Sequence, residues 1–203
     1  MDILSPPHAT GPGVLVAHPW WGLNQTIRDY GAALASEGFL VGLPDLFEGA
    51  VTTTIEGAQQ LAHSNWPNAT DRLSKALNEL AEATGGAVGA VGFSYGAFHL
   101  MRLLETDVPL SGLAIYYATF SPLPPQHAPV LAHLAENDAE ESTADMQALS
   151  AALSAAGSPN AAFTYSGTKH WFAESDRPEF DASAAGLAFE RTVQFLRATQ
   201  ATK

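Results

Sequence analysis

The sequence contains no cysteine and few basic side chains. Zero cysteines among 203 residues exclude disulfide bonds, thiolate metal sites and a thiol nucleophile. Lysine and arginine together number 9 against 21 aspartates and glutamates, and the formal net charge is -12. Nucleic-acid binding draws its free energy largely from basic side chains that neutralise phosphates, so no nucleic-acid partner is expected.

Long apolar runs are also missing. No run approaches the roughly 18 residues of a membrane span, and the first residues lack the basic and apolar stretches of a secretion signal. A composition of 46% hydrophobic and 15% charged residues indicates a globular chain rather than a disordered one. We therefore expect a soluble, cytoplasmic protein without a membrane partner, folded as a single domain over residues 1–203.

Short apolar runs alternate with helical patterns along the whole chain. The expected strands are 13–17, 39–43, 87–92, 112–117, 130–135 and 161–165. The expected helices are 25–37, 55–64, 68–83, 95–105, 143–156 and 183–200. This alternation favours an α/β fold with a mostly parallel sheet flanked by helices on both faces, in which the loops at strand ends carry the chemistry.

The motif that points most directly to chemistry is Gly92-Phe93-Ser94-Tyr95-Gly96. The pattern G-x-S-x-G between a strand and a helix forms a sharp turn that exposes the serine hydroxyl. The bare pattern arises by chance in about one chain of this length in twenty, and it could also be a small-residue turn that packs a helix on the sheet. The strand before it and the helix after it favour Ser94 as a nucleophile.

A serine nucleophile needs a base, and the base needs a third group that orients it. After a G-x-S-x-G turn, the acid and then the histidine follow in the chain. Asp138 comes just after the apolar run 130–135, and His170 alone of the 7 histidines lies beyond it. Glu136 is the rival of Asp138, and a plain turn aspartate and a plain loop histidine are the non-catalytic alternatives.

Three other histidines lie in or directly after expected strands and helices. His99 falls in an expected helix and His133 in an expected strand, where a structural role is the simpler account. His18 ends the first strand, and a structural role is favoured there too, with a functional one left open. The histidines and carboxylates show no metal-ligand spacing such as H-E-x-x-H, so neither a metal nor another cofactor is expected.

A tetrahedral intermediate needs two backbone N–H donors, which together form an oxyanion hole. One is expected from Tyr95, directly after the nucleophile. The other is expected from the loop 18–24, where Pro19 has no N–H and Trp20 is therefore the first available donor. Aromatic residues at the expected strand ends suggest a pocket for an apolar acyl or alcohol group, although some of them must belong to the core. These aromatic residues are Trp20, Trp21, Tyr95, Tyr116, Tyr117, Trp171 and Phe172. Of these we expect Trp20, Tyr95 and Trp171 to line the pocket.

Taken together, these segments resemble the dienelactone hydrolase family from Val14 onward. The resemblance is carried by residues 18–24, 28–29, 42–46, 91–96, 114–117, 129–138, 169–172 and 185–196. It implies an α/β-hydrolase fold without a large lid domain, activity on ester or lactone bonds, and a triad of Ser94, Asp138 and His170.

Three positions depart from the pattern of that family. Its members typically have cysteine where this chain has Ser94, and a glutamate that holds the thiol where this chain has Pro19. Members that act on carboxylate-bearing dienelactones have an arginine four residues after the catalytic histidine, where this chain has Glu174. We therefore expect Glu174 at the substrate pocket and a substrate other than dienelactone.

The sequence thus predicts a serine hydrolase that cleaves a small ester or lactone through an acyl-enzyme. A thioesterase would use the same residues, and a non-catalytic small-molecule-binding member of the fold is the alternative from another class. The expected partner is a small-molecule substrate, and the expected state is a monomer or a small homo-oligomer.

Overall fold

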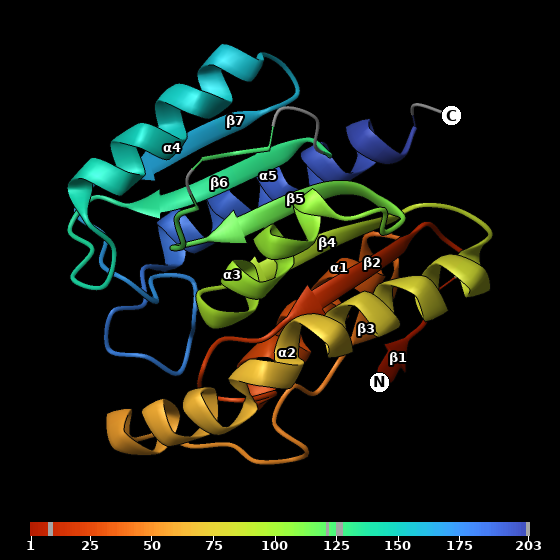
Figure 1. Cartoon of the computed structure of the whole chain (residues 1–203), viewed down its shortest axis with the longest axis horizontal. Coiled ribbons are helices and arrows are strands. Elements are labelled where there is room, and N and C mark those ends of the chain that lie inside the picture. The colour runs from red at the N-terminus through yellow and green to blue at the C-terminus, as the bar shows by residue number, and fades with distance from the viewer. Residues whose placement is uncertain (8–9, 121, 125–127, 202–203) are drawn as a thin grey trace.

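One seven-stranded sheet with helices on both faces forms the body of the computed structural model, which describes residues 1–7, 10–120, 122–124 and 128–201 (Figure 1). The strand order is β1-β3-β2-β4-β5-β6-β7. Strand β1 pairs antiparallel with β3, and the other neighbours pair in parallel. The strands are β1 Asp2–Leu4, β2 Gly13–Ala17, β3 Leu40–Leu43, β4 Val88–Phe93, β5 Leu110–Tyr116, β6 Val130–Ala135 and β7 Ala161–Tyr165. The predicted mostly parallel sheet is therefore confirmed.

The helices divide between the two faces of this sheet. They are α1 Gln25–Ser36, α2 Ile55–Thr84, α3 Tyr95–Arg102, α4 Thr143–Ala156 and α5 Ala182–Gln200, with a 3-10 turn at Leu103–Glu105. Helices α2, α3 and α4 pack on one face and α1 and α5 on the other. In the described part of the chain, no separate lid domain interrupts this arrangement. None of the described helices is long and apolar enough to cross a membrane.

Side-chain alternation along the central strands builds a separate core on each face. In β2, Leu15 and Ala17 belong to the cluster under α2, α3 and α4, while Val14 and Val16 belong to the cluster under α1 and α5. All residues of β2, β4 and β6 are buried. Burial on both faces explains why these strands are continuous apolar runs in the sequence.

The two helices predicted at 55–64 and 68–83 are in fact one helix, α2, with Pro67 inside it. Proline removes a hydrogen bond and crowds the preceding turn, which is why a break was expected. The helix continues because apolar residues on both sides of Pro67, Ala58 and Leu73 among them, are buried against the rest of the protein. Packing of an apolar face stabilises a helix more than local propensity does.

The short edge strand β1 was not predicted. It has only three residues, and none of them is fully buried, so no apolar alternation marks it in the sequence. Its backbone pairs with β3 through the register Asp2 to Leu43 and Leu4 to Val41. The remaining strands and helices lie close to their predicted ranges.

The turn from β4 into α3 depends on two glycines at close backbone contacts. A Cβ on Gly92 would lie 2.5 Å from Ala97 Cα, and a Cβ on Gly96 would lie 2.6 Å from the carbonyl oxygens of both Ala17 and His18. These separations are shorter than real Cβ contacts. Glycine therefore allows the start of α3 to lie directly against the end of β2.

Gly96→Ala should lower the free energy of unfolding by about 1–3 kcal/mol, because its Cβ must displace two backbone carbonyls. The matched control is Gly186→Ala in α5, where a Cβ would meet no atom within 4 Å. The control should raise stability by about 0.5–1 kcal/mol, since alanine loses less conformational entropy than glycine in a helix. Urea unfolding at equilibrium measures both. Equal effects of the two substitutions would contradict the close packing at Gly96.

Candidate active site

Ser94 lies at the end of β4 in a strained backbone conformation. Its φ of 44° and ψ of -108° fall outside the regions that residues with a side chain ordinarily adopt. The Ser94 N–H donates to the Tyr116 carbonyl at 3.0 Å, so the strand pairing continues up to this residue. Although Ser94 is the N-cap residue of α3, its hydroxyl does not cap the helix. The hydroxyl is therefore free for another partner.

That partner is His170, which in turn contacts Asp138. His170 Nε2 lies 3.0 Å from Ser94 Oγ, and His170 Nδ1 lies 2.8 and 2.9 Å from the two oxygens of Asp138. A carboxylate only accepts hydrogen bonds, so Nδ1 carries the proton and Nε2 presents its lone pair to the serine hydroxyl. The structure thus brings the three predicted residues into one hydrogen-bonded chain.

The Asp138 carboxylate is fully buried and has further partners on its own loop. Its Oδ1 accepts the backbone N–H groups of Glu140 and Glu141 at 2.9 and 3.0 Å. Donors on the carboxylate compensate for its burial and hold it in one orientation. The same carboxylate therefore orients His170 and fixes the turn after β6.

The rival acid, Glu136, has different partners. Its Oε2 accepts from Ser166 Oγ at 3.1 Å and from the Gly167 N–H at 2.8 Å. The loops after β6 and β7 are also joined by the Asn137 N–H, which donates to the Thr168 carbonyl at 2.9 Å. Glu136 helps to hold these loops together, and Asp138 alone of the two contacts His170.

Two further strained residues contact the His170 ring. Tyr117 has a φ of 39° and Trp171 a φ of 64°. The Tyr117 and His170 ring centroids lie 4.8 Å apart, and those of Trp171 and His170 lie 5.0 Å apart. Strained backbone conformations cluster at functional sites, because the surrounding structure must hold them in place. With Ser94, three of the positive-φ residues other than glycine lie at this site.

The two backbone N–H groups predicted to bind an oxyanion, those of Tyr95 and Trp20, have no acceptor among the described residues. Tyr95 is the first residue of α3, where an N–H group has no partner within the helix and the helix dipole favours negative charge. Among the described residues, the Trp20 N–H has no hydrogen-bond acceptor. The Pro19 carbonyl accepts from His18 Nδ1 at 2.7 Å and from the Gly22 N–H at 3.3 Å. In a planar trans peptide, the Trp20 N–H points the opposite way from the Pro19 carbonyl, and therefore away from His18 and Gly22, which donate to that carbonyl.

His18 therefore has a definite structural position. Its Nε2 accepts the Leu46 N–H at 3.0 Å, which leaves Nδ1 as the donor to Pro19. Burial lowers the pKa of His18 to about 4, so the ring is neutral at physiological pH. His18 connects the loop after β2 to the chain after β3, and it orients the peptide that carries the Trp20 N–H.

The other two internal histidines are held by hydroxyl groups. His99 Nδ1 lies 2.8 Å from Thr70 Oγ1, and burial lowers its pKa to about 4. His133 bonds to the Tyr165 hydroxyl at 2.8 Å and to Thr192 Oγ1 at 3.0 Å, and burial lowers its pKa to about 3. Both rings are neutral parts of the interior. In the described ranges, no group of three or more His, Asp or Glu side chains is placed to hold a metal ion.

A pocket of about 270 Å³ opens beside Ser94 and His170. Of the residues expected to line it, Trp20 and Tyr95 do so. Its other wall residues were not singled out from the sequence: Ala62, Trp66, Phe98, Glu140 and Glu141. This volume lies just below the range of roughly 300–1,000 Å³ that is usual for small-molecule sites.

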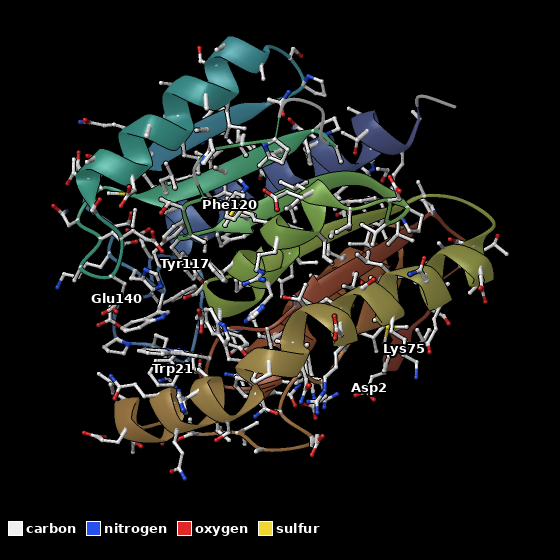
Figure 2. The ribbon with its side chains drawn as sticks, in the orientation of Figure 1. Asp2, Trp21, Lys75, Tyr117, Phe120 and Glu140 are labelled. Carbon is white, nitrogen blue, oxygen red and sulfur yellow. The ribbon has the colours of Figure 1, made fainter. Side chains whose placement is uncertain are left out.

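Two signals in the sequence could have indicated these missed residues. Trp66 is a large aromatic residue that directly precedes Pro67. Glu140 and Glu141 follow Asp138 within the same turn. Figure 2 shows Glu140, Tyr117 and Trp21 at the same end of the molecule, where the parallel strands have their carboxyl ends.

Trp171 does not line the pocket, contrary to expectation. Its ring stacks on Trp20 at a centroid distance of 5.9 Å and packs edge-on against Trp21 at 5.3 Å. Trp171 instead packs against the Trp20 ring, which lines the pocket. The aromatic residues Tyr116, Tyr117 and Phe172 are completely buried, so they belong to the core.

The expectation that Glu174 faces the pocket is wrong. Its side chain is completely buried, and its Oε1 accepts the Tyr117 hydroxyl at 2.7 Å. The Glu174 N–H donates to the Trp171 carbonyl at 2.9 Å, a tight turn that directs residue 174 into the interior. Burial raises the pKa of Glu174 to about 8, so the carboxyl carries a proton at neutral pH.

Comparisons with known proteins agree with this architecture. The family model described as "Dienelactone hydrolase family" matches residues 2–200. Protein usf of Aquifex pyrophilus is 27% identical over 96% of this chain and 91% of its own length. A protein of Aquifex aeolicus (strain VF5), provisionally named carboxymethylenebutenolidase, is 24% identical over the same shares. The crystal structure of the dienelactone hydrolase-like promiscuous phosphotriesterase P91, from metagenomic libraries, has a TM-score of 0.81 at 19% identity, covering 97% of this chain and 91% of that one.

Glu174→Gln should stabilise the protein increasingly as the pH rises. The folded-state pKa of Glu174 is about 8 against an ordinary value of 4.5, so the wild type loses stability between those two pH values. Glutamine stays neutral and still accepts the Tyr117 hydroxyl. The melting temperatures of Glu174→Gln and wild type are measured by calorimetry from about pH 5 to 9. The advantage of the variant should grow as the pH rises and level off above the folded-state pKa of about 8. The exposed control Glu82→Gln should show no such trend, and a constant difference for Glu174→Gln would contradict its burial.

Proposed function

The chain belongs to the dienelactone hydrolase family, and we propose that it cleaves a small ester or lactone through an acyl-enzyme formed on Ser94. It is a hydrolase with the α/β-hydrolase fold. The observation that carries the proposal is the hydrogen-bonded chain from Ser94 Oγ through His170 to Asp138. Since the chain has no cysteine, the nucleophile in this proposal is a hydroxyl, where the family resemblance implies a thiol in most members.

Acylation begins when Ser94 Oγ attacks the carbonyl carbon of the substrate. The hydroxyl proton moves to His170 Nε2, and the resulting imidazolium is stabilised by the Asp138 carboxylate. The carbonyl oxygen becomes an oxyanion, for which the backbone N–H groups of Trp20 and Tyr95 are the donors. His170 then gives its proton to the leaving alkoxide, the carbon–oxygen bond breaks, and the acyl group stays on Ser94.

Deacylation repeats these steps with water as the nucleophile. His170 Nε2 removes a proton from the water, which attacks the acyl carbon and again forms an oxyanion next to Trp20 and Tyr95. Collapse of this intermediate returns the proton to Ser94 Oγ and releases the carboxylic acid. With a lactone, the alcohol remains tethered to the acyl group and leaves with it.

Two relatives support this reaction class. The Aquifex aeolicus protein carries the provisional name carboxymethylenebutenolidase. A structural neighbour is described as a cold-adapted esterase, with a TM-score of 0.73 over 96% of this chain. Ester and lactone hydrolysis both require a nucleophile, a base and oxyanion donors in the arrangement around Ser94.

Ser94→Ala should abolish hydrolysis of short p-nitrophenyl esters and prevent labelling by a fluorophosphonate probe. Only a serine activated by a base reacts with such a probe, and loss of the nucleophile leaves only the contributions of binding and the oxyanion donors. The melting temperature should stay nearly unchanged, since the Ser94 hydroxyl does not cap α3. The matched control is Ser111→Ala, which removes a buried hydroxyl that has no partner in the described structure. Residual turnover of Ser94→Ala within tenfold of wild type would refute the assignment.

A further inference from the structure

The pocket beside Ser94 is lined by two carboxylates that have no basic partner among the described residues. Glu140 and Glu141 both line it, and the residues that line it in the described structure include no lysine or arginine. The Glu141 carboxylate accepts a hydrogen bond from the Thr119 hydroxyl. Within the described ranges, neither glutamate forms a salt bridge.

The cationic side chains nearest in sequence to the site belong elsewhere. Lys169, next to His170, lines a different hollow together with Phe180. The Arg177 guanidinium lies 4.4 Å from the centroid of the Trp21 ring and pairs with Asp176. Among the described residues, neither of these two cations is paired with Glu140 or Glu141, so a cationic ligand could approach both carboxylates.

The backbone that carries Glu140 and Glu141 is also held in position. Asp138 accepts both of their backbone N–H groups, at 2.9 and 3.0 Å, so the turn that carries them is fixed to the carboxylate that contacts His170. Burial raises the pKa of Glu141 above its ordinary value, whereas the hydrogen bond from Thr119 and the nearby His170 act in the opposite direction and favour the charged form. The backbone turn that carries the two carboxylates thus has a fixed place relative to Ser94.

The opposite walls of the pocket are aromatic. Trp66 from α2 packs against Phe98 and Tyr95 of α3, at centroid distances of 5.0 and 5.8 Å, and Trp20 comes from the loop after β2. Trp66 is 45% exposed, which leaves a large ring open to the pocket mouth. Aromatic π-systems attract cations, most effectively at tryptophan, and they suit alkylated ammonium groups that have no N–H to donate.

We propose that this pocket binds a quaternary ammonium group, and that the preferred substrates are small esters with such a group close to the scissile bond. The inference rests on the proposed function of Ser94 and adds the substrate class. Carboxylates supply the charge, and Trp20, Trp66, Tyr95 and Phe98 supply apolar, π-rich contacts for the methyl groups. A net charge of -12 attracts cationic ligands toward the protein. Carboxylate-bearing esters are disfavoured by the same charges.

Binding can be tested without turnover in the Ser94→Ala variant. The probes are choline and its neutral isostere 3,3-dimethylbutan-1-ol, which replaces the ammonium nitrogen by carbon. Tryptophan fluorescence or calorimetry measures both dissociation constants. Choline should bind at least about tenfold more tightly, a difference that increased salt reduces because the charges lie near the surface. If choline binds no more tightly than the isostere, the inference fails.

Variants that replace one glutamate by glutamine test whether the bound cation lies next to Glu140 and Glu141. Glu140→Gln and Glu141→Gln should each weaken choline binding by roughly 3- to 10-fold, as expected for loss of one nearby charge. Glu141→Gln retains an oxygen that can accept from the Thr119 hydroxyl. The control Glu82→Gln makes the same charge change at an exposed position of α2, and it should leave choline binding as in wild type. Equal effects of all three variants would overturn the site.

Turnover by the wild-type protein then separates the two claims. The ratio of kcat/KM for acetylcholine to that for 3,3-dimethylbutyl acetate should exceed about ten and fall in Glu140→Gln and Glu141→Gln. If both esters are cleaved with a ratio near one, the inference fails while the proposed function stands. If choline binds as described but neither ester is cleaved, the hydrolysis assigned to Ser94 fails while the cation site stands.

Discussion

The strained backbone of Ser94 is the constraint on which the rest of the active site depends. A positive φ at a serine costs on the order of 1–3 kcal/mol, and the surrounding contacts must offset that cost. The Ser94 N–H bonds to Tyr116 in β5, and Gly96 lies against the carbonyls at the end of β2. This conformation turns the hydroxyl away from the helix and toward His170, and it leaves the Tyr95 N–H uncapped beside it.

The parallel sheet determines which loops meet Ser94. Strands β6 and β7 end at the same edge as β4, so the loops that carry Asp138 and His170 converge there, joined by the bond from Asn137 to Thr168. The Asp138 carboxylate accepts hydrogen bonds from His170 and from the backbone N–H groups of Glu140 and Glu141. In our account, one buried carboxylate thus couples the orientation of the base to the charge of the substrate pocket.

The sequence predicted most of the sheet and the three residues of the hydrogen-bonded chain, because apolar runs, a G-x-S-x-G turn and chain order are local signals. The pocket was harder to predict. Trp66 was missed because Pro67 suggested a helix break, whereas packing on both sides keeps α2 continuous. Glu174 was expected at the pocket by analogy with an arginine in relatives, but a tight turn after Trp171 directs it inward. Which way a loop side chain points depends on tertiary contacts.

Replacing Ser94 by cysteine tests the contact between residue 94 and His170 most directly. The family resemblance implies a glutamate that holds the thiol where this chain has Pro19. Pro19 has no polar side chain, so a thiol at position 94 should form a thiolate and imidazolium pair with His170. The measurement is the rate of alkylation of Ser94→Cys by iodoacetamide from about pH 5 to 9. We expect an inflection well below the ordinary thiol pKa of roughly 8.5. An inflection at or above that value would mean that His170 does not act on position 94.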